Sequence, residues 1–233
     1  METCGDYRCL NTITGSDRYP IRTISSINDR LFGSKIFSKF DLVEAYYNIP
    51  MAEDDIKKTA VTTTFGLFEF LRMPFGLRNA AQTFQRYMDS IFRNLTYVFV
   101  YLDDILIFSK NETEHFNHIK EVLEILAQNN LRINLEKCSF YKNSLNFLGH
   151  KISADGITPL EEKVSALIEM PLPNDYASLR RFLGMIGFYR RFVPNFAEIT
   201  NELYSLLSSY DKNPKDYPGL QVVKILLLIL KSR

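Results

Sequence analysis

The stretch Tyr97–Phe108 (YVFVYLDDILIF) carries two adjacent acids, Asp103 and Asp104, inside an otherwise apolar run. Burying a carboxylate without a partner is costly or forces its protonation, so a cation is expected opposite the pair. The flanking segments, Tyr97–Tyr101 and Ile105–Phe108, are rich in β-branched and aromatic residues, which predicts two strands with the acids at the turn of a hairpin. A carboxylate pair on a rigid hairpin suits a divalent metal ion.

Composition places the chain among globular proteins. Its 233 residues are 46% hydrophobic and 13% aromatic, which is enough for the core of one large domain or two small ones. Because Lys and Arg number 28 and Asp and Glu number 27, a nucleic-acid surface would have to come from local clustering of charge. Cys4, Cys9 and Cys138 cannot all pair and lack the spacing of a zinc site, which indicates reduced thiols in an intracellular protein.

The termini show no targeting or membrane signal. Residues Met1–Gly5 carry no basic or apolar region of the kind found in a secretory or transit peptide. The apolar block Val222–Leu230 is interrupted by Lys224 and is far shorter than the ~20 residues that a membrane span needs. We therefore expect an intracellular protein with no membrane partner.

Hydrophobic periodicity predicts alternating strands and helices up to about residue 154 and helices after it. The expected elements are a helix at Thr23–Phe32, a strand at Ile36–Leu42, a helical stretch near Glu53–Lys58, a hairpin of Thr59–Thr63 and Phe68–Met73, helices at Asn79–Leu95 and Glu112–Gln128, and strands near Cys138–Tyr141 and Leu145–Ser153. Later helices are expected at Leu160–Glu169, Ala177–Phe192 and Phe196–Leu207. We expect domains at 1–154 and 155–210, with an irregular tail at 211–233.

A third acid, Asp41, falls near the end of an expected strand, where it could converge with Asp103 and Asp104 on one patch of sheet. Taken alone, Asp41 is more often a cap or a solvated turn residue. Hard oxygen ligands select magnesium or manganese and imply a phosphate-ester substrate. His115 and His118, spaced i, i+3, could also bind metal, but a solvated helix face is favoured and we assign them no role.

Four ordered motifs resemble those of reverse transcriptases of Gypsy-like long-terminal-repeat retrotransposons. They are Phe40–Tyr46 (FDLVEAY), Met73–Leu77 (MPFGL), Tyr101–Asp104 (YLDD) and Phe147–His150 (FLGH). Segments near Asp6–Asn11 and Phe182–Phe192 resemble the family's fingers strand and thumb. The resemblance implies an α+β right-hand polymerase palm (βαββαβ, an antiparallel sheet with helices on one face), partial fingers and a helical thumb. It implies an RNA-directed DNA polymerase that is a fragment of a retrotransposon polyprotein.

The resemblance also implies roles for individual residues. Asp41 and Asp103 would bridge two Mg²⁺ ions, for which Mn²⁺ is an alternative, with the Leu42 carbonyl as a further ligand and Asp104 in support. Tyr46 would exclude a 2′-hydroxyl and so select deoxynucleoside triphosphates. Lys137 would protonate the leaving pyrophosphate, although a lysine in this position is more often a solvated charge. The implied nucleotide-binding residues are Leu42, Val43, Glu44, Ala45, Tyr46, Phe75, Gly76 and Gln85.

A template with its primer, of RNA or DNA, is the implied macromolecular partner. The implied contacts are Asp6, Arg8, Asn11, Phe147, Leu148, Gly149, Arg180, Gly184, Gly187, Phe188 and Arg191. Arg180, Gly184, Gly187 and Arg191 have the spacing of one helical stripe, smooth and basic, which suits close approach of a phosphate backbone. Glycine could instead serve tight helix packing. The opposite face, including Leu179, Phe182, Leu183 and Ile186, is expected to form core.

The chain departs from the family pattern at both ends. Basic residues expected just before Asp6 are nearly absent, with Glu2 and Thr3 in their place, and 221–233 aligns with nothing. RNase H and integrase regions would belong to the parent polyprotein, located in a cytoplasmic particle or the nucleus. A catalytic polymerase therefore competes with a truncated remnant that at most binds template and primer. An RNA-dependent RNA polymerase or nucleotide cyclase is disfavoured by Tyr46 and by the thumb.

Overall fold

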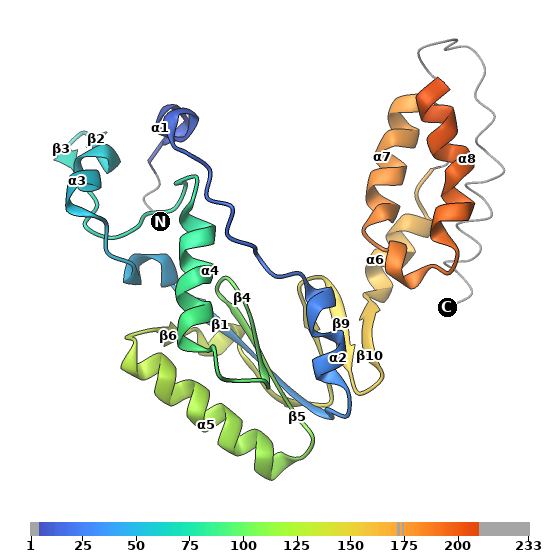
Figure 1. Ribbon diagram of the computed structural model, residues 1–233, viewed down its shortest axis with the longest axis horizontal. Helices are drawn as coiled ribbons and strands as arrows, with labels where there is room; N and C mark the ends of the chain where they lie inside the picture. Colours follow the sequence, from blue (N-terminus) through green and yellow to red (C-terminus); the bar gives the residue numbers. More distant parts are fainter. Residues whose placement is uncertain (1–4, 172, 174, 210–233) are drawn as a thin grey trace. The chain divides into compact units, whose positions relative to one another are not determined.

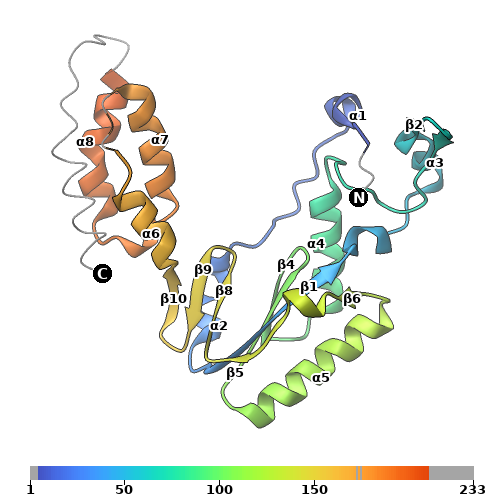
Figure 2. The ribbon, with the colours of Figure 1, turned by 180° about the vertical axis from the view of Figure 1, so that it is seen from behind.

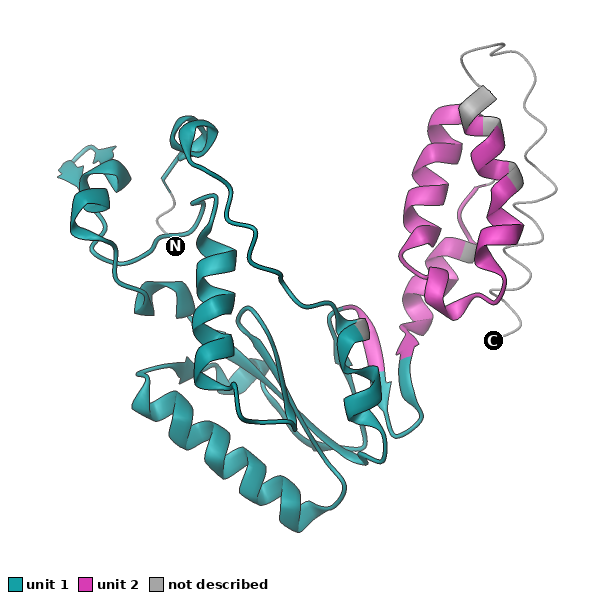
Figure 3. Cartoon of the chain, viewed as in Figure 1, with its two compact units in different colours: residues 1–148, 152–157 teal, residues 149–151, 158–233 magenta. Residues whose placement is uncertain are grey.

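The computed structural model describes residues 5–171, 173 and 175–209 (Figure 1). The chain forms two compact units, one of residues 1–148 and 152–157 and one of residues 149–151 and 158–233 (Figure 3). The expected tail at 211–233, with its apolar block, lies outside the described residues. None of the helices in the described part of the chain is both long and apolar enough to cross a bilayer.

The first unit is built on a five-stranded sheet. Its strands are β1 (Ile36–Val43), β4 (Val98–Tyr101), β5 (Asp104–Ser109), β6 (Arg132–Ile133) and β7 (Ser139–Lys142). The order is β4-β5-β1-β6, with β7 also paired to β1, and the pairings of β1 and of β4 with β5 are antiparallel. The hairpin predicted around the paired acids is thus β4-β5, and it lies beside the strand that carries Asp41 (Figure 2).

Two helices, α4 (Ala80–Ile91) and α5 (Glu112–Gln128), pack on one face of this sheet. Phe40 and Leu42 of β1 belong to the same buried cluster as Phe84 of α4 and Val122 of α5. Because successive strand residues point to opposite faces, Asp41 lies on the face away from these helices. The palm arrangement, an antiparallel sheet with helices on one face, therefore leaves its acids on the other face.

The remainder of the first unit consists of short elements. They are α1 (Arg8–Ile13), η1 (Ile24–Ile27), α2 (Asn28–Leu31), η2 (Ala45–Asn48), α3 (Glu53–Ile56), η3 (Lys57–Thr59), β2 (Val61–Thr63), β3 (Gly66–Phe68) and η4 (Leu135–Lys137). The fingers strand expected near Asp6–Asn11 is wrong, because that segment enters α1. The backbone hydrogen bonds of this segment are local, as in the bond that the Asn11 amide donates to the Tyr7 carbonyl. In a strand, the backbone amides and carbonyls would instead bond to a neighbouring strand.

A three-stranded sheet of order β10-β9-β8 joins the two units in sequence. It comprises β8 (Ser144–Phe147), β9 (His150–Ser153) and β10 (Gly156–Pro159). The single strand expected at Leu145–Ser153 is therefore two. Leu148 and Gly149, with φ of 47° and 74°, reverse the chain between them, since paired positive φ values make a tight hairpin turn.

The second unit is helical. It contains α6 (Glu161–Ile168), α7 (Tyr176–Gly187), η5 (Arg190–Phe192) and α8 (Phe196–Ser209). Asp175 caps α7 by accepting the Ser178 amide. The residues expected to form the inner face of α7 are buried, as predicted: Leu179, Phe182, Leu183 and Ile186. The helix ends at Gly187 rather than Phe192, so the stripe inferred from helical spacing does not extend to Arg191.

Candidate active site

The acids of β1 and of the hairpin are brought together by the pairing of β1 with β5. Asp41 lies opposite Asp104 in the register, and the Leu42 amide donates to the Asp103 carbonyl at 3.0 Å. A pocket of about 240 Å³ opens beside them. It is lined by Asp41, Leu42, Val43, Glu44, Ala45, Tyr46, Phe75, Asp103, Asn134 and Lys137. Residues expected to bind metal and nucleotide thus share one cavity.

Asp103 stands in an acidic environment. Partial desolvation raises the pKa of its carboxyl group, and the neighbouring Asp104 and Asp41 raise it further, against the opposing effect of Lys137. Burial, with a smaller effect of Asp103, raises the pKa of Tyr46 to about 12, so its hydroxyl is neutral at pH 7. The effect of Asp104 and Asp41 on Asp103 is a repulsion between like charges, which a bound cation would relieve.

Asp104 has a different environment from Asp103. Its Oδ1 lies 2.8 Å from the Lys39 ammonium, and this side chain does not line the pocket. Among the described residues, no three acidic, histidine or cysteine side chains form a compact metal-ligand cluster. The structure therefore gathers Asp41 and Asp103 at the pocket and pairs the third acid with a lysine.

Lys137 lies at the edge of the pocket, at the end of η4. Its Nζ is 3.8 Å from Asp41 Oδ1, and the side chain is 66% exposed. Asn134, three residues earlier, also lines the pocket and donates its backbone amide to the Asp41 carbonyl at 2.8 Å. Sequence reasoning did not select Asn134, because only the pairing of β1 with β6 brings it to this place.

Aromatic rings form one wall of the pocket. The Tyr46 ring meets Phe75 and Phe84 edge to face, with centroids 4.8 Å and 5.0 Å apart. Gly76 follows Phe75 with a φ of 91°, a conformation that favours glycine, and its carbonyl accepts from Asn11 Nδ2 at 2.8 Å. The Asn11 Oδ1 accepts the Arg78 amide. Asn11, expected to contact nucleic acid, instead has both ends of its side-chain amide bonded to the turn that holds Phe75.

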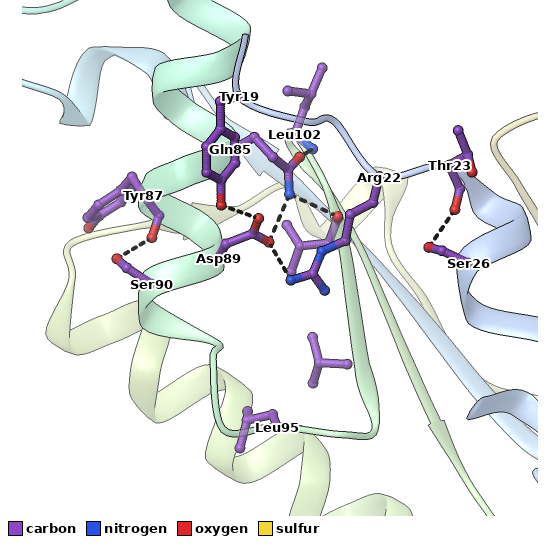
Figure 4. Close-up of polar contacts among 12 residues, drawn as sticks. Tyr19, Arg22, Thr23, Ser26, Gln85, Tyr87, Asp89, Ser90, Leu95 and Leu102 are labelled. Atoms are coloured by element: carbon purple, nitrogen blue, oxygen red, sulfur yellow. Dashed lines mark hydrogen bonds and ion pairs between the residues drawn. The ribbon is translucent and has the colours of Figure 1, made fainter. Parts of the chain in front are cut away.

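Gln85 does not line the pocket, contrary to the expected nucleotide contact. Its side chain is fully buried, and Oε1 accepts the Leu102 amide at 2.8 Å (Figure 4). Its Nε2 donates to Asp89 Oδ1 and to the Val100 carbonyl. Gln85 therefore supports the acidic hairpin from the helix behind it.

Other residues expected to bind nucleic acid in the first unit differ in exposure. Asp6 and Arg8 form an exposed ion pair, and hydrogen bonds from Arg8 hold the pKa of Asp6 at about 2. Phe147 is buried against Phe99, so its ring belongs to the core and is not a contact surface. Leu148 lies at the turn that follows. Of the three FLGH motif residues expected to contact the primer, Phe147 is therefore buried, whereas Leu148 and Gly149 form the hairpin turn.

In the second unit, Arg180, Gly184 and Phe188 are exposed along α7 and its end, with Gly187 partly exposed. A Cβ atom at Gly184 or Gly187 would meet nothing within 4 Å, so these glycines do not serve tight packing within the structure. The exposed Arg191, beyond the helix, lies over the Phe192 ring.

His115 is a buried residue that sequence reasoning misplaced. It was expected on a solvated helix face, but it is fully buried between Ser38 of β1 and Ser109 of β5, each 2.7 Å from a ring nitrogen. Burial lowers the pKa of His115 to about 4. The two serines lie on strands, whereas His115 lies on a helix, so the spacing between His115 and His118 could not predict these contacts.

The family model described as reverse transcriptase (RNA-dependent DNA polymerase) matches residues 2–152. The chain is a member of the reverse transcriptase family. The retrovirus-related Pol polyprotein from transposon 297 of Drosophila melanogaster is 47% identical over 209 residues, which are 89% of this chain and 20% of that protein. The Pol polyprotein from transposon gypsy of the same organism is 41% identical over 204 residues, which are 87% of this chain and 20% of that protein.

Solved structures of the family agree with this reverse transcriptase assignment. The foamy viral protease-reverse transcriptase in complex with double-stranded DNA matches with a TM-score of 0.87 and 26% identity, over 97% of this chain and 40% of that one. The foamy viral protease-reverse transcriptase in complex with an RNA/DNA hybrid matches with a TM-score of 0.81 and 26% identity, over 97% of this chain and 31% of that one. The resemblance to retrotransposon reverse transcriptases and the right-hand polymerase fold are therefore confirmed. The chain spans about a fifth of the length of the curated relatives it matches.

Proposed function

We propose that this chain supplies the palm and thumb of an RNA-directed DNA polymerase, which extends a primer 3′ end with deoxynucleotides by nucleotidyl transfer. The observation that carries the proposal is the pocket in which Asp41 and Asp103, from different strands, meet Tyr46 and Lys137. An acidic patch, an aromatic wall and a cation in one cavity fit a metal-bound triphosphate. The curated relatives are polyproteins, and in a polyprotein RNase H and integrase regions would be partners of this part.

Reverse transcriptases generally use divalent metal ions, and the pocket residues fit such ions. The carboxylates of Asp41 and Asp103 line the same pocket. Carboxylate and carbonyl oxygens are hard donors of the type that Mg²⁺ and Mn²⁺ prefer. Asp41, Asp103 and the Leu42 carbonyl would hold two ions, and Asp104, which lies opposite Asp41 in the register, would support them. The bound ions would supply electrostatic stabilisation of the attacking and leaving oxygens.

The nucleotide would occupy the rest of the cavity. Backbone amides from Leu42 to Ala45 would face the triphosphate, and Phe75 with Gly76 would lie over the base. The Tyr46 ring, held by Phe75 and Phe84, would exclude a ribose 2′-hydroxyl, so deoxynucleoside triphosphates are the proposed substrates. Lys137, close to Asp41, would give a proton to the leaving pyrophosphate.

The template and primer would contact the second unit through the exposed surface of Arg180, Gly184 and Gly187. Open space above both glycines and the basic side chain beside them support this placement. The related foamy viral proteins were solved with double-stranded DNA and with an RNA/DNA hybrid, which are the ligand classes that we propose here.

Primer extension on an RNA template, with deoxynucleotides and Mg²⁺, tests the proposal. Asp103→Asn should reduce incorporation by at least ~10³-fold because it removes a charge from the metal site. Asp155→Asn, which changes an exposed turn aspartate outside the pocket, should extend like wild type. Equal extension by wild type and Asp103→Asn would refute the site. Failure of all three proteins, with duplex binding retained, would favour the alternative, a remnant that only binds template and primer.

A further inference from the structure

A line of polar side chains connects the N-terminal segment to the acidic hairpin behind the pocket (Figure 4). The Tyr19 hydroxyl donates to Asp89 Oδ2 at 2.7 Å, and Arg22 Nη2 lies 3.3 Å from Asp89 Oδ1. Gln85 Nε2 donates to the same Asp89 Oδ1 at 3.1 Å, and Gln85 Oε1 accepts the Leu102 amide at 2.8 Å. The line runs from the N-terminal segment to Asp89, from Asp89 to Gln85 within α4, and from Gln85 to the β4-β5 turn.

The carboxylate of Asp89 and the Val100 carbonyl together fix which way the Gln85 amide points. An ionised carboxylate only accepts hydrogen bonds, so the NH₂ end of Gln85 must face it. The Val100 carbonyl, 3.2 Å from the same nitrogen, also accepts only. The oxygen end of the Gln85 amide therefore faces the Leu102 amide and accepts its hydrogen bond. Tyr19 and Arg22 hold the Asp89 carboxylate in turn, and its side chain is only 13% exposed.

The Leu102 amide, which donates to Gln85 Oε1, belongs to a strained turn. Leu102 has a φ of 53°, a left-handed conformation that is unfavourable for a residue with a Cβ. Such conformations persist where the surrounding structure determines them. Asp103 is the next residue, and its carbonyl accepts the Leu42 amide, so the conformation of the turn decides where the Asp103 carboxylate points.

We propose that Asp89 is a positioning residue for Asp103, acting through the orientation of Gln85. The inference rests on the proposed function for its catalytic consequence. Neither Asp89 nor Gln85 lines the pocket, so their loss should leave nucleotide affinity unchanged and should misplace the acid. This separates a positioning role from a binding role, because the expected effect falls on kcat and not on KM.

The first measurement is hydrogen exchange of the Leu102 amide by NMR, in the 233-residue chain without metal or nucleotide. Gln85→Met, which keeps the length of the side chain but has no acceptor, should speed exchange by about 10-fold, the value of one hydrogen bond. Asp89→Ala should also speed exchange, because Gln85 Nε2 then keeps only its bond to the Val100 carbonyl and the amide is held less firmly. Asp89→Asn, whose amide oxygen can still accept from Gln85, should restore most of the protection.

Arg86→Met is the matched control. Arg86 lies on the same helix and ties the same N-terminal segment through its ion pair with Asp17 and its position over the Tyr19 ring, but it bonds to neither Asp89 nor Gln85. Its variant should exchange Leu102 like wild type. Unchanged exchange in Asp89→Ala would overturn the proposal, whatever the effect of Gln85→Met. Equal acceleration by Arg86→Met would also overturn it, because general tethering of the segment would then be the cause.

The second measurement is primer extension by the same proteins. Asp89→Ala and Gln85→Met should lower kcat by about 10-fold, with the KM for deoxynucleotide within about twofold of wild type. A rise in KM at constant kcat would refute the positioning role. If wild type itself does not extend the primer, the proposed function fails, and the exchange rates still decide whether Asp89 controls the turn.

Discussion

The Lys39 ammonium lies 2.8 Å from Asp104 Oδ1, so the two adjacent acids of the hairpin face different surroundings. Apart from this ion pair, that oxygen has no hydrogen-bond partner among the described residues. Asp103, in contrast, lines the pocket together with Asp41. A pair that looks equivalent in the sequence is therefore divided into one acid at the pocket and one held by a lysine of the neighbouring strand.

This division predicts unequal effects of removing each charge. Asp104→Asn should lower primer extension by about 10-fold, whereas Asp103→Asn should lower it by at least ~10³-fold, because, of the two hairpin acids, only Asp103 lines the pocket in which we propose that metal ions bind. Single-turnover extension at saturating Mg²⁺ measures both. Lys39→Met in the Asp104→Asn background should cost little more, since the lysine has then already lost its partner. Equal losses for both single variants would contradict the division.

Tyr46 is expected to control the choice of sugar. Tyr46→Ala should lower the preference for a deoxynucleotide over the matching ribonucleotide by about 10²-fold, because the ring that would exclude the 2′-hydroxyl is gone. The ratio of kcat/KM values for the two nucleotides measures the preference. Tyr47→Ala is the control, since its ring also meets Phe75, with centroids 5.8 Å apart, but does not line the pocket. An unchanged ratio in Tyr46→Ala would remove this role.

The elements of the palm could be predicted because their signals are local. The apolar flanks of the acid pair predicted the β4-β5 hairpin, and the periodicity of 112–128 predicted α5 with the bounds observed. The expected convergence of Asp41 with the hairpin followed from strand ends, and the register pairs Asp41 with Asp104.

The roles of several polar residues could not be predicted because their partners are distant in sequence. Gln85 bonds to an amide 17 residues away, and Asn11 bonds to a carbonyl 65 residues away. Such bonds depend on how helix, strand and turn pack, which residue type and spacing do not encode. Phe147 was expected to contact nucleic acid because of the family resemblance, and its burial against Phe99, 48 residues earlier in the sequence, could not be predicted from the local pattern.

Buried His115 should make folding sensitive to mild acid. Burial, assisted by nearby His118, lowers the pKa of His115 to about 4 from an ordinary value near 6.5. The folded state therefore needs the neutral ring, and this stability is present above pH 6.5 and is lost as pH falls from 6.5 toward 4. At pH 5 the loss should be about 2 kcal/mol in the free energy of unfolding.

Urea unfolding at pH 7.5 and pH 5 measures this dependence. His115→Gln cannot take up a proton, so its free energy of unfolding should fall less between pH 7.5 and pH 5 than that of wild type. At pH 7.5 the variant should be less stable than wild type. His118→Gln is the comparison, because His118 is partly exposed and should contribute less. An equal pH dependence for wild type and His115→Gln would show that His115 is not the titrating group.

Substitutions at Gly184 of α7 test whether this glycine belongs to a nucleic-acid contact surface or serves helix packing. Because a Cβ at Gly184 meets nothing within 4 Å, Gly184→Ala should raise the free energy of unfolding by about 1 kcal/mol through helix propensity alone. Gly184→Leu should fold equally well but should weaken binding of an RNA/DNA duplex by about 10-fold, since a large side chain would hold the phosphate backbone away. Thermal unfolding and fluorescence anisotropy measure the two effects, and Gly184→Ala is the control for binding. If Gly184→Leu binds the duplex as wild type does, nucleic acid does not approach this face, whereas lower stability of Gly184→Ala would reveal a packing role for the glycine.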